Sequence, residues 1–101
     1  MSITTHIHAS VASISLSGAV DYSAQEEFRT ANAQALSAAK VREIQVDFSE
    51  ATFLDSSAIR ALLILQKQAE EKEISLVLVN CNSSIRDIFD VGGFDKMFMI
   101  R

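Results

Sequence analysis

Alternation of apolar and polar side chains predicts strands in the first half of the chain. Residues 11–17 and 42–48 both place apolar side chains on every second position. This period is typical of a strand with one buried and one solvated face. Residues 3–8 predict a shorter strand, and the two residues after it suit a tight hairpin. Gly18 is expected to end the second strand.

Three segments show the apolar repeat of amphipathic helices. The first starts at Ser23, which we expect to form a capping box with Glu26, and runs to about Ala39. The second covers residues 56–72. The third is a short helix for which residues 82–84 offer several caps, and two glycines at 92 and 93 supply its stop signal.

The order of these elements predicts an α/β fold. Residues 74–79 form a nearly continuous apolar run, which indicates a central strand, and residues 97–100 predict a last short one. Strands separated by helices pair in parallel. We therefore expect one domain over residues 1–101, with a mixed, mostly parallel sheet and an N-terminal antiparallel hairpin. The polar faces of the strands place three to four helices mainly on one face.

Composition supports a packed globular domain and disfavours two classes of partner. The 101 residues are 49% hydrophobic and 22% charged, without proline, which is typical of a packed domain. The net charge is −4 and the basic residues are scattered, which disfavours nucleic acid and anionic membranes as partners. The chain lacks the features of a signal peptide and any apolar run near the roughly 20 residues that span a bilayer. We expect no membrane insertion and a cytoplasmic location, in which the lone Cys81 is a packing residue.

Polar residues converge at the start of the second helix, at Asp55, Ser56 and Ser57. Aspartate and serine are favoured N-caps, so an ordinary cap is one interpretation. Unpaired N–H groups at the same place also favour a phosphate, which is the other interpretation.

Other chemistry is weakly indicated. His6 and His8 share one strand face, but without a second ligand pair at zinc-like spacing they suggest a solvated edge strand. Ser56 lies outside any G-x-S-x-G elbow, and the sequence has neither a Walker A loop nor a G-x-G-x-x-G loop. We therefore expect no metal, no cofactor and no enzymatic activity. An enzyme of unknown type is the weakest alternative.

Three segments together resemble the STAS family, in its bacterial anti-sigma factor antagonist branch. Residues 46–57 are similar to the strand, loop, aspartate and phosphorylatable serine of that family. Residues 18–21 resemble its second-strand glycine and following aspartate, and residues 85–94 resemble its third helix. The order and spacing of these segments cover nearly the whole chain.

The resemblance implies that Ser56 is the phosphate acceptor. It also implies a partner-binding surface made of the acceptor and its neighbours, namely Asp21, Asp55, Ser56, Ser57 and Ala58. Many members have glycine where this chain has Ala58, and alanine favours a helix by roughly 1 kcal/mol over glycine. The first turn should therefore be stiffer than in those members.

The resemblance further implies a partner-switching protein. The unphosphorylated form would bind a serine kinase or anti-sigma factor of the histidine-kinase-like ATPase type. Phosphorylation of Ser56 would release this partner, and a PP2C-type phosphatase would restore binding, controlling transcription, biofilm formation or secretion. The alternative is a non-switching STAS subunit of a lipid-transport ABC complex. We expect a monomer or a weak dimer.

Overall fold

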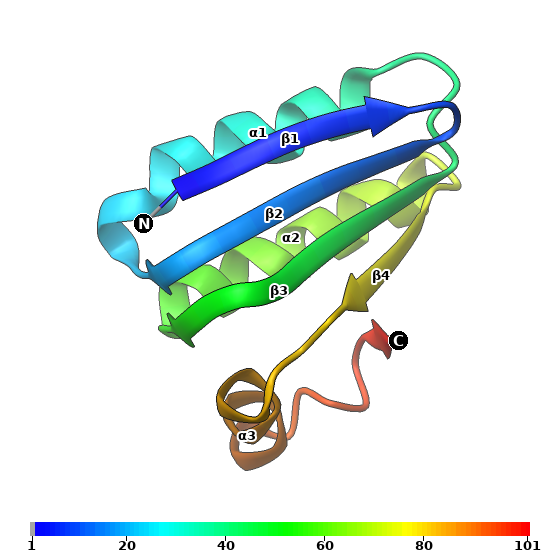
Figure 1. Cartoon of the computed structure of the whole chain (residues 1–101). Coiled ribbons are helices and arrows are strands. Elements are labelled where there is room, and N and C mark those ends of the chain that lie inside the picture. The colour runs from blue at the N-terminus through cyan, green and yellow to red at the C-terminus, as the bar shows by residue number, and fades with distance from the viewer. Residues whose placement is uncertain (1) are drawn as a thin grey trace.

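The computed structural model describes residues 2–101 and has one five-stranded sheet in the order β1-β2-β3-β4-β5 (Figure 1). β1 pairs antiparallel with β2, and the other neighbouring strands are parallel, as the sequence pattern predicts. The elements are β1 (Ser2–His8), β2 (Val11–Val20), the 3-10 turn η1 (Tyr22–Ala24), α1 (Gln25–Ser37), β3 (Glu43–Leu54), α2 (Ser56–Glu71), β4 (Ser75–Val79), α3 (Ser83–Gly92) and β5 (Met99–Ile100).

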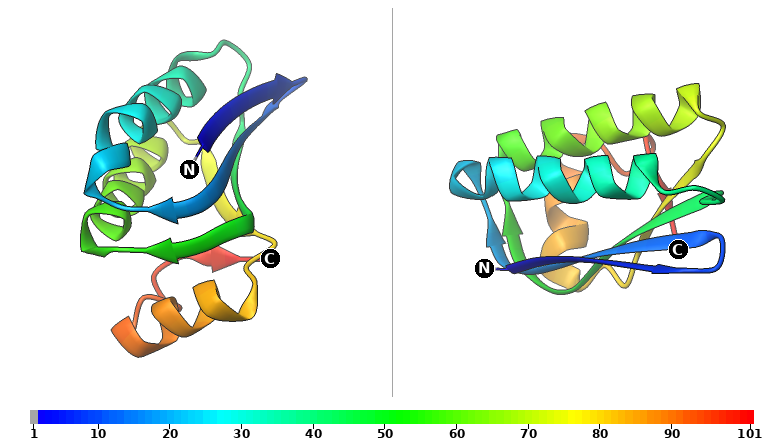
Figure 2. Two further views of the ribbon diagram at one scale, coloured as in Figure 1. Left: turned by 60° about the vertical axis from the view of Figure 1, so that its left-hand side comes forward. Right: turned by 90° about the horizontal axis from the view of Figure 1, so that it is seen from above.

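Helices cover one face of the sheet. α1 and α2 lie side by side over it, and α3 packs against β3 farther along (Figure 2). Ile14, Val46 and Leu78 are aligned across three parallel strands on this face and are fully buried. The alternate positions, such as Ser13 and Gln45, form the opposite, polar face. The predicted one-sided arrangement is confirmed. Among residues 2–101, every helix is too short or too polar to cross a membrane.

An aromatic cluster joins α3 to the sheet. The rings of Phe48 and Phe89 meet edge to face with centroids 5.9 Å apart. The rings of Phe89 and Phe98 are tilted to each other, with centroids also 5.9 Å apart. Such pairs add about 0.5–1.5 kcal/mol to the burial of their apolar area. The cluster therefore fixes α3 and the C-terminal segment on the core.

Two strands are longer than the sequence pattern predicts. Gly18 has φ +78° and marks a register shift, so it forms a bulge instead of ending β2. β3, expected to end at Phe48, continues because the extended β2 pairs with it as far as Val20 opposite Leu54. The extra pairing was missed because its polar residues resemble a loop.

The predicted capping box at the first helix is wrong. Ser23 donates both its N–H and its hydroxyl to the carboxylate of Asp21, so Asp21 caps η1 instead. α1 then starts at Gln25 without a side-chain cap and ends at Ser37, short of Ala39. Asp21 is the cap because its carboxylate accepts both hydrogen bonds from Ser23, two residues ahead, as in an Asx turn.

The predicted glycine stop after α3 is confirmed. Gly93 adopts a left-handed conformation with φ +73°, which costs glycine little. Its N–H donates to the carbonyl of Asp90 at 3.1 Å, and the N–H of Phe94 donates to that of Phe89 at 2.8 Å. These bonds satisfy the last carbonyls of the helix.

Truncation of the aromatic cluster should strongly destabilise the fold. We expect F89A to lower the free energy of unfolding by about 3–5 kcal/mol, because it removes a fully buried ring and leaves a cavity. V91A on the same helix is the control, since Val91 is 89% exposed, and should change it by less than about 0.5 kcal/mol. Urea unfolding measures both. Equal effects of the two substitutions would contradict the packing described.

Candidate functional site

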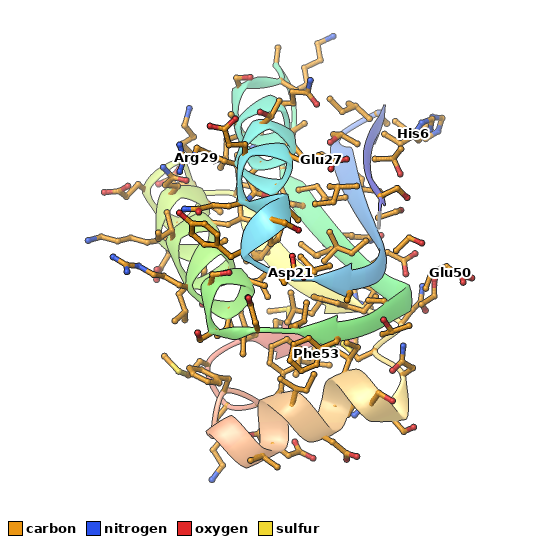
Figure 3. The ribbon with its side chains drawn as sticks, turned by 90° about the vertical axis from the view of Figure 1, so that its left-hand side faces the viewer. His6, Asp21, Glu27, Arg29, Glu50 and Phe53 are labelled. Carbon is orange, nitrogen blue, oxygen red and sulfur yellow. The ribbon has the colours of Figure 1, made fainter. Side chains whose placement is uncertain are left out.

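The candidate site lies at the carboxyl edge of β2 and β3. Val20 and Leu54 are paired across these parallel strands, so the residues that follow them, Asp21 and Asp55, leave the sheet at the same edge. The N–H of Asp55 donates to the carbonyl of Val20 at 3.2 Å and closes the pair. Both helices that cover the sheet begin from this edge, and Figure 3 shows Asp21 there.

Asp55 connects the starts of the two helices. One carboxylate oxygen accepts hydrogen bonds from the N–H of Ala58 at 2.9 Å and from the hydroxyl of Ser57 at 2.6 Å. The other oxygen accepts from the N–H of Tyr22 at 3.0 Å. Asp55 is therefore both the N-cap of α2 and a bridge to η1.

These donors determine the charge state of Asp55. Burial acts to raise the pKa of its carboxyl group, because it disfavours the charged form. The Ser57 hydroxyl and the N–H groups of Ala58, Tyr22 and Ser57 act in the opposite direction and together outweigh it. The pKa of Asp55 is thus lowered, and the carboxylate is charged near neutral pH.

The two serines have different environments. Ser56 is the first residue of α2 and its side chain is exposed. Ser57 is half-buried and its hydroxyl is bound to Asp55. Ser56 is thus the serine that another protein can reach.

Four of the five residues expected at the partner surface come together here. The side chain of the fifth, Ala58, does not reach the surface. Asp21 is exposed, and the N–H of the next residue, Tyr22, is bound to Asp55, beside Ser56 and Ser57. Ala58 is only 3% exposed and its methyl group packs in the core. Its effect is therefore on the packing of the first turn of α2.

A groove of about 870 Å³ runs between α1 and α2. Ser56 and Ser57 lie at the end where α2 begins. Its lining residues include the exposed Tyr22 and Ile64 and two arginines, Arg29 and Arg60. The sequence interpretation missed this groove. The spacing of four residues from Ser56 to Arg60 was a usable signal, whereas Arg29 is brought in by packing alone.

The remaining sequence candidates lie away from this site. His6 and His8 are exposed on the edge strand β1, and His6 projects from the polar face of the sheet (Figure 3). Within residues 2–101, no three His, Cys, Asp or Glu side chains are grouped to hold a metal ion. Cys81 is half-buried, and burial raises the pKa of its thiol despite the nearby Arg86. The thiol is therefore mostly protonated at neutral pH.

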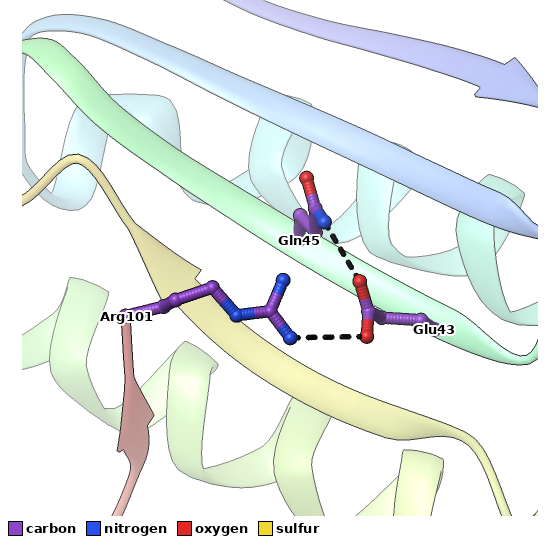
Figure 4. Close-up of polar contacts among 3 residues, drawn as sticks. All are labelled: Glu43, Gln45 and Arg101. Carbon is purple, nitrogen blue, oxygen red and sulfur yellow. Dashed lines mark hydrogen bonds and ion pairs between the residues drawn. The ribbon is translucent and has the colours of Figure 1, made fainter.

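The polar face of the sheet carries a small network instead of a site. Figure 4 shows Glu43 between two partners, accepting from Gln45 at 2.7 Å and from Arg101 at 3.4 Å. The Arg101 side chain is 57% exposed, so solvent screens this ion pair. Pairs of this kind are worth about 0–1 kcal/mol and tie the C-terminal residue to β3.

The chain belongs to the STAS domain family, because the family model described as "Mlab, STAS domain" matches residues 3–101. It is 34% identical over 87 residues to the STAS-domain containing protein PA14_20770 of Pseudomonas aeruginosa (strain UCBPP-PA14). That alignment covers 86% of this chain and 84% of the relative.

Solved structures confirm the fold. The unphosphorylated anti-sigma factor antagonist SpoIIAA has a TM-score of 0.76 at 22% identity, over 99% of this chain and 87% of that one. The phosphorylated form of SpoIIAA, described as a Bacillus cell fate determinant, has a TM-score of 0.75 at 23% identity, over 99% and 91%. The family predicted from the three sequence segments is therefore confirmed.

Loss of the Asp55 bridge should destabilise the protein in a pH-dependent way. We expect D55A to lower the free energy of unfolding by about 1–2 kcal/mol near pH 7. The folded pKa is lowered relative to an unfolded value of about 3.9, so this stabilisation is complete above that value. It is lost as the pH falls through the folded pKa. The difference in free energy of unfolding between D55A and the unmodified protein should therefore narrow at low pH. Urea unfolding from about pH 7 to about pH 2 measures it.

The control for this prediction is D21A, which removes only the cap of the short turn η1. It should cost less than D55A at neutral pH. A gap between D55A and the unmodified protein that stays constant down to about pH 2 would show that the charge of Asp55 is unimportant.

Proposed function

We propose that this protein is a non-enzymatic binding protein of the anti-sigma factor antagonist type, controlled by phosphorylation of Ser56. The unphosphorylated form binds a serine kinase or anti-sigma factor of the histidine-kinase-like ATPase type. The observation that carries the proposal is the exposed Ser56 at the start of α2, beside a Ser57 whose hydroxyl is bound. Membership of the STAS family supports it.

The proposed modification is a phosphoryl transfer from ATP. The bond from the γ-phosphorus to the bridging oxygen breaks, a bond to Ser56 Oγ forms, ADP leaves, and the kinase takes up the hydroxyl proton. A PP2C-type phosphatase reverses the state by hydrolysis, which releases inorganic phosphate. This protein supplies the acceptor hydroxyl and a rigid frame for it, in a cytoplasm that contains ATP.

The surroundings of Ser56 suit a switch that acts on binding. Phosphorylation adds about −1.5 to −2 charges. The N-terminus of α2 favours a negative group there, so the fold should survive the change. The binding surface comprises Ser56, the carboxylates of Asp21 and Asp55, and the hydroxyl of Ser57, while Ala58 stiffens the turn from within. A partner docked on this surface meets added bulk and charge, and releases.

A second candidate is a non-switching STAS subunit of a lipid-transport ABC complex. The family model that matches residues 3–101, "Mlab, STAS domain", is the reason to keep this candidate, because it fits a STAS binding subunit as well as a switch. In that case the serine patch is contact surface alone. Binding to an ATP-binding cassette protein that is insensitive to S56D would support this candidate and contradict the switch.

Phosphorylation should map to Ser56. We expect the cognate serine kinase to label the unmodified protein with ATP, and to label S57A and S83A but not S56A. Ser83 is a matched control, because it is also an exposed serine in the first position of a helix. Tandem mass spectrometry identifies the modified residue. Label that persists in S56A and disappears in S57A would overturn the assignment.

A negative charge at Ser56 should weaken binding without unfolding the protein. We expect S56D to bind the same kinase at least about a hundredfold more weakly, which corresponds to about 2.7 kcal/mol. The thermal melt followed by circular dichroism should stay nearly unchanged, since the group is exposed. S83D places the same charge at the start of α3 and should leave the affinity, measured by calorimetry, unaltered. A large loss of helix signal in S56D would show that Ser56 is needed for the fold, and would contradict a role in binding alone.

A further inference from the structure

Two arginines share the groove with Ser56. Arg29 of α1 and Arg60 of α2 both line it, and both are exposed. None of the described residues that line the groove is acidic, although the chain has a net charge of −4. The groove is therefore a local concentration of positive charge next to a hydroxyl.

Both arginines lie near the starts of their helices. Arg60 follows Ser56, the first residue of α2, by four positions, and Arg29 follows Gln25, the first residue of α1, by four. α1 and α2 each leave the same edge of the parallel sheet, so their first turns lie side by side (Figure 2). Figure 3 shows Arg29 on the side of α1 that faces α2. Arg60 thus stands one turn in from the serine end of the groove, and Arg29 lines the groove from the facing helix.

Neither arginine is committed elsewhere. Within residues 2–101 the ion pair present joins Arg101 to Glu43, on the other face of the sheet. Side chains four residues apart on a helix have Cβ atoms about 5–6 Å apart, so Arg60 can reach a group on Ser56. Arginine binds phosphate through two parallel N–H···O bonds, which a lysine does not offer.

We propose that Arg60, assisted by Arg29, binds the phosphoryl group of phosphorylated Ser56. The occurrence of this state in the cell rests on the proposed function, but the binding itself is a property of this chain. The interaction closes the serine end of the groove and neutralises its positive charge. Phosphorylation then changes the groove as well as the surface of Ser56.

The nearby carboxylates oppose this binding but do not prevent it. Asp55 already accepts three hydrogen bonds, and Asp21 accepts two from Ser23. These donors hold both carboxylates in place, whereas the exposed arginine side chains are able to change rotamer. The two arginines can therefore move toward the phosphoryl group, whereas the two carboxylates that repel it stay in place.

The test uses protein that carries phosphoserine at position 56 by genetic code expansion. Phosphorus NMR measures the pH midpoint of its second ionisation, which is about 6 in an unperturbed phosphoserine. We expect R60Q to raise the midpoint of the phosphoprotein by roughly 0.5 pH unit, and R29Q by less. R60K, which keeps the charge but not the paired donors, should retain most of the lowered midpoint.

K67Q is the matched control. Lys67 is an exposed cation on α2, but it is seven residues, or roughly 10 Å along the axis, beyond Arg60 and outside the groove. It should leave the midpoint unchanged in about 0.15 M salt. An R60Q midpoint equal to that of K67Q would overturn the proposal. Since the phosphate is introduced during translation, this result is independent of whether a kinase modifies Ser56, so the two proposals fail separately.

Discussion

The carboxylate of Asp55 holds the starts of two helices together. One oxygen caps α2 and accepts from Ser57, and the other accepts from the N–H of Tyr22 just before α1. A single charged side chain thereby fixes the edge of the sheet from which both helices leave. Because its donors lower the pKa of Asp55, the bridge is present near neutral pH. Ser56 owes its exposed position to this bridge, since the residues on either side of it are bound.

The bridge depends in turn on the length of two strands. The bulge at Gly18 lets β2 continue to Val20 and pair with the end of β3 at Leu54. Without these extra pairs, Tyr22 would not lie within hydrogen-bonding distance of Asp55. A positive φ at one glycine therefore determines the geometry of a site several residues away. The same extension leaves Phe53 48% exposed, next to the site on the chain.

Sequence patterns were sufficient to predict the architecture, because the local period of apolar residues distinguishes strands from helices. Alternation identified β2 and β3, and the apolar repeat identified all three helices. The strand ends were not predicted, because they depend on which strands pair. The cap at Asp21 was not predicted either, because it depends on which side chain accepts from the same N–H group. Asp55, Ser56 and Ser57 were found because they are contiguous. Arg29 was not, since only the packing of α1 on α2 brings it to the groove.

Under the proposed function, the rigidity of this edge makes a phosphate on Ser56 better suited to the control of binding than to the control of folding. In the free protein the phosphate on Ser56 would be exposed to water. Two unit charges 4 Å apart in water interact by about 1 kcal/mol, and salt screens charges that are more than roughly 8 Å apart. The helix N-terminus contributes about 0.3–1 kcal/mol in its favour, the exposed Arg60 and Arg29 would add to this, and Asp21 and Asp55 oppose it by similar amounts. These terms nearly cancel, so the fold barely responds. In the proposed complex a docked partner would remove water from the site. The charge of the phosphate would then lie in a low dielectric against Asp55 and Ser57, which are already hydrogen-bonded to each other. The cost then appears almost entirely at the interface.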